Sequence, residues 1–222
     1  MDGNGRWARE RGKSRIAGHR AGGEAAREVV EAAAELGIEA LALYGFSTEN
    51  WRRPKAEVGG LFRLLGQFLK KETPELVTNG IRLRAIGRRD RMPAAAREEL
   101  EKSEAATADG ERMTLFLAID YGARDEILGA ARALAERAAE GSLRPKDVDL
   151  AALEGHLYTG GMPQVDLMIR TGGEVRVSNF LLWQISYAEL YFVPLYWPDF
   201  GKKELTEALA EYSRRERRFG GL

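Results

Sequence analysis

The chain has 222 residues, of which 44% are hydrophobic and 31% are charged, as in an ordinary folded globular domain. Its 34 Lys and Arg residues balance 34 Asp and Glu residues, so charge gives no reason to expect nucleic acid or an anionic membrane as an obligatory partner. The absence of cysteine excludes disulfides, thiolate metal sites and cysteine nucleophiles, and favours a cytoplasmic location. Polar residues interrupt the longest apolar stretch, residues 180–197, so we predict no membrane span. Without repeats or linkers, residues 1–222 are expected to form a single domain.

The chain begins with its most unusual peptide, Met1-Asp2-Gly3-Asn4-Gly5-Arg6-Trp7. Glycines on both sides of Asn4 allow backbone N–H groups to point at one anion, as in phosphate-binding nests. Asp2 adds a carboxylate, which suits a magnesium ion that already carries phosphate oxygens. Taken alone, the peptide is equally compatible with a mobile polar terminus that binds nothing.

Residues 18–53 predict a helix, a strand and a polar loop. Apolar residues at helical spacing indicate the helix over 18–36, and a short apolar run indicates a buried strand over 38–46. His19, near the start of the helix, is a candidate hydrogen-bond donor to a phosphate, although a capping or packed histidine explains it as well. The polar loop that follows the strand lies where open α/β sheets bind their ligands.

The rest of the chain continues this alternation. Residues 55–71 carry an apolar stripe at helical spacing, and Gly59 and Gly60 within it indicate close packing or a neighbouring cavity. The run Arg88-Arg89-Asp90-Arg91 is interpreted as a solvated loop. Further strands are predicted at 80–87 and 113–120, and further helices at 94–106, around 127–138, at 149–157 and at 203–218. This order predicts an α/β fold with a mostly parallel central sheet flanked by helices.

Residues 166–192 combine several anion-binding features. An apolar strand over 165–169 leads to Arg170 and a turn on Gly172 and Gly173, and Arg176 and Ser178 follow. Ser178-Asn179 stands where a helix cap belongs, so we predict a helix over the apolar run 180–185, with Glu189 on its far side as a possible metal ligand. Arginines, a hydroxyl and a helix N-terminus would together suit a diphosphate, whereas the competing interpretation leaves the arginines facing solvent.

Five separated motifs resemble the cis-prenyltransferases, and the resemblance extends to the C-terminal Arg217-Arg218-Phe219-Gly220-Gly221. They are residues 1–7, Gly18-His19, residues 46–54, residues 166–174 and residues 178–184. The resemblance implies an enzyme that condenses isopentenyl diphosphate onto an allylic diphosphate, such as farnesyl diphosphate, with cis double bonds. It also implies that Mg²⁺ is the cofactor.

The family's site residues carry over position by position. By resemblance, Asp2 binds magnesium and helps the allylic diphosphate leave, with Glu189 as the second magnesium carboxylate. The allylic diphosphate is held by Gly3, Asn4, Gly5, Arg6, Arg15 and His19. Isopentenyl diphosphate is held by Arg170, Arg176 and Ser178, and Trp7 and Val177 are further substrate-binding candidates. The reaction centre is lined by Ser47, Thr48, Glu49, Asn50, Trp51 and Arg53. The family assigns Asn50 as proton acceptor; since a carboxamide is essentially non-basic, we expect Asn50 to orient the true acceptor.

The expected product is a long-chain polyprenyl diphosphate, an undecaprenyl-type precursor of the cell-wall lipid carrier, in an apolar tunnel beside the 55–71 helix. A shorter-chain synthase and a catalytically silent subunit of a heteromeric enzyme are the alternatives, and the intact aspartate loop argues against a silent subunit. An all-helical trans-type prenyltransferase would need Asp-Asp-x-x-Asp clusters, and a nucleotide-binding enzyme a Walker sequence; neither occurs.

Partners follow from the same resemblance. We expect a homodimer, because the family is dimeric and residues 180–197 are rich in aromatic side chains, with the Arg218-Phe219-Gly220 tail reaching the partner's active site. We also expect peripheral membrane contact during product release, and no nucleic acid. Family members carry an apolar strand directly before the aspartate loop, whereas Met1 directly precedes Asp2 here. We therefore expect the natural protein to have roughly one more strand upstream, and a chain extended by this strand to melt higher and turn over faster.

Overall fold

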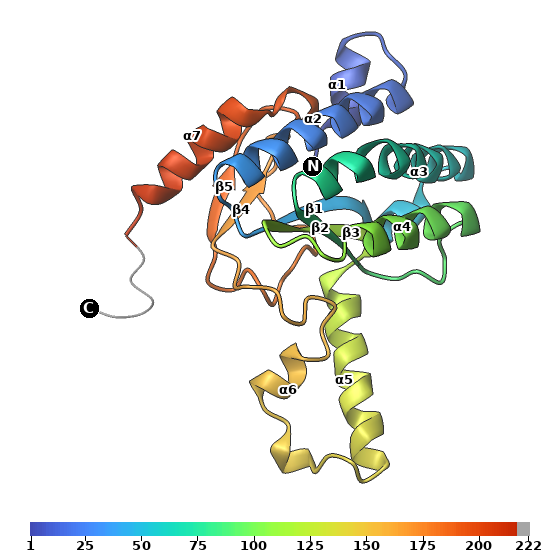
Figure 1. Ribbon diagram of the computed structural model, residues 1–222, viewed down its shortest axis with the longest axis vertical. Helices are drawn as coiled ribbons and strands as arrows, with labels where there is room; N and C mark the ends of the chain where they lie inside the picture. Colours follow the sequence, from blue (N-terminus) through green and yellow to red (C-terminus); the bar gives the residue numbers. More distant parts are fainter. Residues whose placement is uncertain (217–222) are drawn as a thin grey trace.

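The computed structural model describes residues 1–216, in which helices and strands alternate around a parallel sheet (Figure 1). The helices are α1 (Asn4–Glu10), α2 (Arg15–Glu35), α3 (Lys55–Thr78), α4 (Ala94–Ala106), α5 (Ala123–Ala139), α6 (Leu150–Glu154) and α7 (Lys202–Ser213). The strands are β1 (Ala40–Ser47), β2 (Ile81–Ile86), β3 (Met113–Tyr121), β4 (Leu167–Arg170) and β5 (Glu189–Phe192). Short 3₁₀ helices are η1 (Thr48–Arg52), η2 (Pro145–Asp147) and η3 (Trp197–Asp199).

The central sheet has the order β1-β3-β2, and all its strands are parallel. The middle strand, β3, is buried on both faces because successive side chains point in opposite directions. Leu115 and Ile119 face the core under the long helices, whereas Phe116 and Ala118 face a second apolar cluster. The predicted parallel α/β architecture is therefore confirmed.

Helices α2 and α3 cover one face of this sheet, and irregular chain covers the other (Figure 1). The second face is packed by apolar residues such as Leu181 and Ile185, which belong to no helix or strand. Helices α5 and α6 form an arm that projects below the sheet in the view of Figure 1. The carboxyl end of β1, which η1 follows, is only partly buried, whereas that of β3 is buried, with Asp120 and Tyr121 both 0% exposed.

Strands β4 and β5 form a separate two-stranded parallel sheet. A cavity of about 960 Å³ lies between them and β1, lined by the consecutive residues 38–45 on one side and 162–171 on the other. Two strand edges thus face each other across a gap.

Three predicted elements were wrong. Residues 180–185 are not helical: Ser178, Asn179 and Leu181 have φ values of 48°, 61° and 47°, which a right-handed helix cannot contain. A strand, β5, follows them, so Glu189 begins a strand and does not lie on a helix. The last helix ends at Ser213 and not at 218, and the final motif, 217–221, lies outside the described residues. Helix α1, which was not predicted, replaces the expected glycine-rich loop.

Candidate active site

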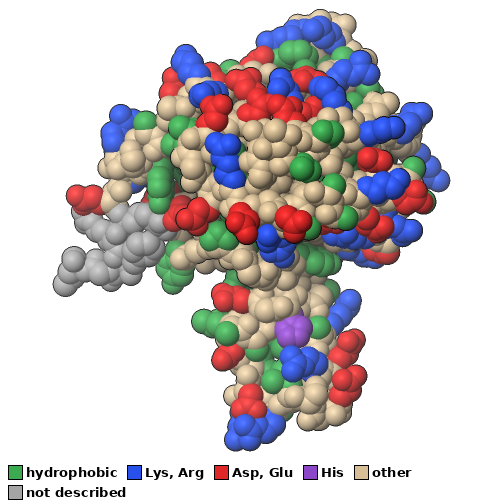
Figure 2. Space-filling view, in the orientation of Figure 1, with side chains coloured by type: hydrophobic (Ala, Val, Ile, Leu, Met, Phe, Trp, Pro, Cys, Tyr) green, Lys and Arg blue, Asp and Glu red, His purple; other side chains and the backbone are tan. Residues whose placement is uncertain are grey.

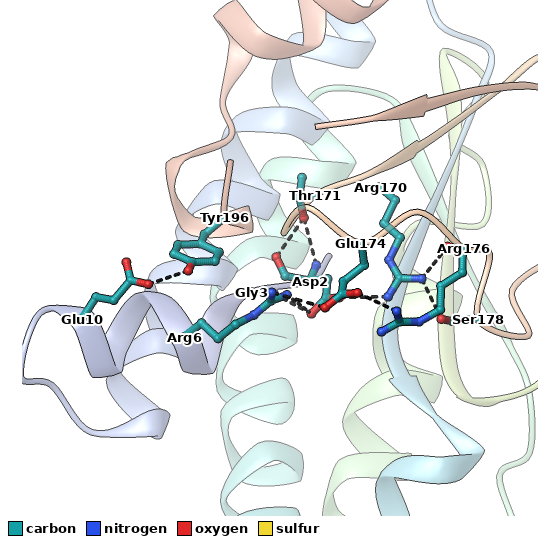
Figure 3. Close-up of polar contacts among 10 residues, drawn as sticks. All are labelled: Asp2, Gly3, Arg6, Glu10, Arg170, Thr171, Glu174, Arg176, Ser178 and Tyr196. Carbon is teal, nitrogen blue, oxygen red and sulfur yellow. Dashed lines mark hydrogen bonds and ion pairs between the residues drawn. The ribbon is translucent and has the colours of Figure 1, made fainter. Parts of the chain in front are cut away.

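Asp2 lies at the centre of a polar cluster formed by α1, β4 and the turn after β4 (Figure 3). Its backbone N–H donates to Thr171 Oγ1 at 3.0 Å, and that hydroxyl donates to the Asp2 carbonyl oxygen at 2.9 Å. The same carbonyl oxygen accepts from the backbone N–H of Trp197 at 3.0 Å. The backbone of Asp2 is therefore tied to two segments that follow it by more than 160 residues.

The Asp2 carboxylate is held by cations. Arg170 donates to Asp2 Oδ2 at 3.0 Å. The guanidinium of Arg6, four residues after Asp2, lies 3.4 Å from Oδ1. Burial on its own would raise the pKa of Asp2, but the hydrogen bond from Arg170 and the charge of Arg6 outweigh burial and leave the pKa below its usual value. Asp2 is thus a carboxylate at neutral pH, available to a cation.

Arg170 is the most fixed guanidinium of the cluster, with a side chain only 13% exposed. Besides Asp2, it donates to Ser178 Oγ at 2.6 Å and to the backbone carbonyl of Arg176. The Arg176 side chain, by contrast, is 61% exposed and pairs with Glu174 at 2.5 Å (Figure 3). Arg170 and Ser178 are thus brought together, whereas the Arg176 guanidinium is paired with Glu174 at the surface, and the residues after Ser178 do not begin a helix.

Glycines let α1 approach α2 closely. A Cβ on Gly18 would lie 2.2 Å from the Asn4 carbonyl oxygen, and one on Gly22 would lie 2.5 Å from Asn4 Oδ1. Gly3 has a φ of 104°, and a Cβ there would meet Tyr196 at 2.5 Å. This packing buries Asn4 Oδ1 and His19 Nε2, neither of which has a hydrogen-bond partner within the described residues. Buried polar atoms without partners indicate room for a polar ligand.

A second group of cations surrounds Glu57, at the start of α3. Its Oε1 lies 3.1 Å from Arg15, 3.3 Å from Arg53 and 4.0 Å from His19 Nε2. Burial, together with the charges of Arg53 and Arg15, lowers the pKa of His19 to about 4, so the imidazole is neutral at pH 7. A neutral imidazole beside two guanidinium groups can still donate to a phosphate oxygen.

The loop after β1 forms η1 and is fixed from two sides. Asn50 Oδ1 accepts from the Ser47 backbone N–H at 3.2 Å. Trp51 donates to Asp120 Oδ1 at 2.8 Å, and the buried Asp120 also binds the Arg91 guanidinium.

Residues 88–91 are not the simple solvated loop that we predicted. Arg91 is held by Asp120, and Arg89 pairs with Glu104 at 2.7 Å. The Glu49 carboxylate accepts from Asn179 at 3.0 Å, which joins η1 to the segment after β4.

The 960 Å³ cavity brings ten of the predicted site residues to one space. Its lining includes Asp2, Asn4, His19, Ser47, Glu49, Asn50, Arg53, Arg170, Val177 and Ser178. A smaller apolar cavity of about 210 Å³ continues from it, because Asn4, His19, Gly45 and Leu61 line both. The arrangement places anion-binding groups at the mouth of an apolar chamber. Such a site suits a molecule with a charged head and a hydrocarbon tail.

Other predicted residues lie apart from this cavity. Trp7 donates to Asp199 at 2.6 Å, and Arg11 lies over its ring, so its indole anchors α1 to η3. Glu189 pairs with Arg215 at 2.9 Å and stands three positions before Phe192, the strand partner of Arg170. At about 3.3 Å per residue, the backbone of Glu189 lies roughly 10 Å along the strand from the Arg170 end.

Sequence reasoning missed three residues that organise the site. They are Thr171, which fixes the backbone of Asp2, Glu57, which collects Arg15 and Arg53, and Glu174, which lies between Arg6 and Arg176. Thr171 and Glu174 lie within the motif 166–174, where the interpretation rested on Arg170 and on Arg176 just after the motif. For Glu57 the only signal is its place three residues after Pro54, at the start of an apolar helix.

Comparisons with known proteins agree with this geometry. Residues 1–220 match the family described as "Putative undecaprenyl diphosphate synthase". The chain belongs to this prenyltransferase family. It is 49% identical over 222 residues to the isoprenyl transferase of Heliobacterium mobile, covering 100% of this chain and 85% of that protein. It is 53% identical over 224 residues to isoprenyl transferase 1 of Bradyrhizobium diazoefficiens, and the match covers 100% of this chain and 87% of that protein.

Solved structures give the same result. The crystal structure of lavandulyl diphosphate synthase from Lavandula x intermedia, in complex with dimethylallyl diphosphate, superposes with a TM-score of 0.96 at 39% identity, covering 99% of this chain and 95% of that one. A probable undecaprenyl diphosphate synthase from Campylobacter jejuni superposes with a TM-score of 0.79 at 39% identity, and the match covers 90% of this chain and 92% of that one. The resemblance to the cis-prenyltransferases and the predicted enzyme class, a prenyltransferase, are therefore confirmed.

Proposed function

We propose that this prenyltransferase elongates an allylic diphosphate such as farnesyl diphosphate with isopentenyl diphosphate, to give a long-chain, undecaprenyl-type polyprenyl diphosphate. The observation that carries the proposal is the pair of cation groups around Asp2 and Glu57 at the mouth of an apolar chamber. In each cycle a carbon–carbon bond forms as the allylic carbon–oxygen bond breaks. The diphosphate leaves with the electron pair, and the isopentenyl unit loses a proton.

The two cation groups suit the two diphosphates. We assign the allylic diphosphate to the side of α1 and α2, where Arg15 and Arg53 now share Glu57 and where Asn4 and His19 present buried polar atoms without partners. We assign isopentenyl diphosphate to Arg170, Arg176 and Ser178. Fixed guanidinium groups stabilise charge on the departing diphosphate without having to reorganise. We further propose that the whole chain, residues 1–222, acts as one catalytic domain.

Asp2 fits a magnesium ion that arrives with a diphosphate. Its carboxylate is ionised and 40% exposed, and magnesium uses one or two protein carboxylates together with phosphate oxygens. Among residues 1–216 no group of three or more acidic or histidine side chains could hold a metal by itself. Bound there, magnesium would neutralise the leaving diphosphate. Glu189 does not fit as a second ligand in this arrangement, because it pairs with Arg215 at the other end of β5.

Asn50 is placed to orient the proton acceptor. Its carbonyl oxygen is engaged by the Ser47 backbone, which turns the amide into a fixed group at the cavity wall. A fixed carboxamide can donate to a water or to a diphosphate oxygen, and that oxygen is the better base. We therefore assign Asn50 a positioning role.

The apolar cavity is the proposed site of the growing chain. It lies between α2, α3 and the sheet, as expected for the tunnel, and Gly45 stands where it meets the polar cavity. A Cβ at Gly45 would lie 2.8 Å from Ile119 Cδ1, so a larger side chain there would narrow the passage. We expect Gly45→Leu to shorten the products, measured by chromatography of the dephosphorylated polyprenols. Unchanged lengths would place the chain elsewhere.

The deciding experiment is turnover of radiolabelled isopentenyl diphosphate with farnesyl diphosphate and magnesium. Long-chain products support the proposal, and short products would favour the shorter-chain synthase, an alternative to which the lavandulyl diphosphate synthase superposition gives some weight. Complete inactivity of the correctly folded protein, rescued by a second subunit, would instead identify the silent-subunit alternative.

We also propose a homodimer. Trp197 is buried and Trp183 bonds Glu154, so the aromatic residues of 180–197 are partly used within the chain, contrary to our expectation. Exposed apolar side chains remain on the α5–α6 arm and beside β5, and several are visible on the arm in Figure 2. They are Leu128, Val148, Leu150, Tyr158, Tyr187 and Leu190. Light scattering should give twice the chain mass at micromolar concentration; a fully active monomer would contradict the proposal. The tail expected to reach the partner lies outside the described residues.

No helix within residues 1–216 is long and apolar enough to cross a membrane. We propose a cytoplasmic enzyme that touches the membrane surface when it releases its product. Co-sedimentation with phospholipid vesicles that increases once long products have formed would support this contact, and product release that is insensitive to vesicles would argue against it.

A further inference from the structure

A carboxylate is buried beside the second apolar cluster, on the face of the sheet opposite α2 and α3. Glu126, in the first turn of α5, is 2% exposed, and its neighbour Tyr121 is 0% exposed. The Tyr121 hydroxyl donates to Glu126 Oε2 at 2.5 Å, and Gln184 Nε2 donates to the same oxygen at 3.1 Å. Burial and the charge of Glu126 raise the pKa of Tyr121, so both donors are neutral groups.

This cluster of polar groups is costly. Glu126 Oε1 and Gln184 Oε1 are both buried and have no hydrogen-bond partner within the described residues. A buried carboxylate that meets only neutral donors is less favourable than a neutral group of the same shape. One reason to retain such a group is that its hydrogen bonds select a single arrangement of the chain around it.

Glu126 selects the arrangement of residues 178–185, which belong to no helix or strand. Through Oε2 it holds Gln184, near the end of this segment. The neighbours of Gln184 in the segment are fixed with it: Leu181 and Ile185 are buried, and the Ile185 backbone N–H donates to the Leu181 carbonyl oxygen at 2.9 Å. The position of Gln184 therefore constrains the turn that contains Leu181.

The other end of the segment carries the hydroxyl assigned to isopentenyl diphosphate. Ser178, Asn179 and Leu181 all have positive φ, a conformation that costs free energy in residues with side chains and persists only where the surroundings impose it. Ser178 Oγ accepts from Arg170 at 2.6 Å, and Arg170 also donates to Asp2 (Figure 3). If the segment were released, this hydroxyl would move away from Arg170.

We propose that Glu126 is a positioning residue for isopentenyl diphosphate, because through Gln184 it fixes the turn that presents Ser178 beside Arg170. The inference rests on the proposed function, which assigns this substrate to Ser178 and Arg170. It separates two properties of Glu126. Its charge costs stability, whereas its hydrogen bonds set the affinity for a substrate that it does not touch.

The test measures the KM for each substrate in variants of this contact. Glu126→Leu should raise the KM for isopentenyl diphosphate roughly tenfold, as for loss of one hydrogen bond to a charged group. The KM for the allylic diphosphate should not change. Glu126→Gln is the conservative variant: its amide oxygen can accept from Tyr121 and Gln184, so it should keep the wild-type KM. Its melting temperature should be equal or higher, because a buried charge is removed.

A second variant reaches the same contact from its other end. Gln184→Leu should raise the KM for isopentenyl diphosphate as Glu126→Leu does, and it carries the test if Glu126→Leu does not fold. The double variant Glu126→Leu/Gln184→Leu should raise this KM no further than either single variant, because both remove one contact. An unchanged KM in both single variants would overturn the proposal, as would a loss of affinity in Glu126→Gln equal to that in Glu126→Leu.

The matched control is Thr107→Val, in another buried polar contact. Thr107 is also 2% exposed, and its hydroxyl accepts from the Leu83 backbone N–H at 3.0 Å, between α4 and β2. This variant should lower the melting temperature and leave the KM for both substrates unchanged. An equal rise in the KM for isopentenyl diphosphate in Thr107→Val would show that any loss of stability has this effect, and would overturn the positioning role.

Hydrogen exchange separates this inference from the proposed function. The backbone N–H groups of residues 178–185 should exchange faster in Glu126→Leu than in the wild type, relative to those of β3, and should not do so in Thr107→Val. Faster exchange without a change in KM, or a change in KM without faster exchange, would overturn the inference. Absence of wild-type turnover would overturn the proposed function, and the exchange rates would still decide whether Glu126 holds the turn.

Discussion

The three-stranded sheet with its long helices and the segment from β4 to β5 belong to the same site but are held by different forces. In the sheet, apolar residues at regular spacing bury themselves against α2, α3 and α4. Between β4 and β5, side-chain hydrogen bonds hold residues with positive φ in irregular turns. The first region is a scaffold that tolerates exchange of one apolar residue for another; the second is a shaped surface that depends on particular polar groups.

The largest expected effect is on the polar side. Asp2→Ala removes the carboxylate that Arg170 and Arg6 share and that we assign to magnesium. We expect turnover to fall by at least about 100-fold, or roughly 2.7 kcal/mol of transition-state stabilisation, as for other preorganised electrostatic groups. Binding of isopentenyl diphosphate should remain largely intact, since Arg170 and Ser178 are unchanged. Steady-state kinetics measures both, and wild-type turnover would refute the assignment of Asp2.

The gap between the two sheets offers the next test. A chain extended before Met1 by an apolar strand should place that strand between β1 and β4, where the edges of both strands face the cavity. New ladder hydrogen bonds and a row of buried side chains should raise the free energy of unfolding by several kcal/mol, comparable to a large part of the stability of a domain. Thermal unfolding measures the effect. Equal melting temperatures for the two chains would show that the gap does not accept a strand.

His19 links the regions, because it stands on a scaffold helix and faces the anion site. Its folded pKa of about 4 lies below the usual 6.5, so between these values the unfolded chain binds the proton and the folded chain does not. Stability should therefore be fully present above pH 6.5 and decline as the pH falls toward 4, by up to about 3 kcal/mol.

His19→Gln should remove this part of the pH dependence of the melting temperature. The matched control is His156→Gln, which changes the only other histidine of the sequence, directly after α6 on the arm. Inorganic pyrophosphate should reduce the fall in melting temperature of the wild type at low pH, because a nearby anion stabilises the protonated imidazole of His19. A decline that persists in His19→Gln would assign the effect to other groups.

The smallest expected effect concerns Asn179, whose φ is 61° and whose side chain bonds both the Arg124 N–H and Glu49. Asn179→Ala should cost about 1–3 kcal/mol of stability through strain and lost hydrogen bonds, and should raise the KM for isopentenyl diphosphate by displacing Ser178. Asn179→Gly should relieve the backbone strain but should not restore the wild-type KM.

The matched variant in the scaffold is Leu100→Ala, which should cost about 2–5 kcal/mol of stability and leave the KM for isopentenyl diphosphate unchanged. If Asn179→Ala and Leu100→Ala change this KM by the same factor, the distinction between the two regions is wrong.

By itself, the sequence determined the scaffold and the chemical character of the site. Short apolar runs predicted β1, β2 and β3 to within a few residues, because burial of apolar side chains is a local signal, and the polar helix predicted over 94–106 has the bounds of α4. Its motifs also singled out Asp2, Arg170 and Ser178, whose contact is now visible. Only the tertiary structure could show that residues 178–181 turn with positive φ instead of forming a helix. That choice is made by partners distant in the chain, among them Glu49 and the N-terminus of α5. For the same reason Glu57, which collects cations from α2 and from the loop before α3, could not be found by spacing: its importance lies in which charges the fold brings to it.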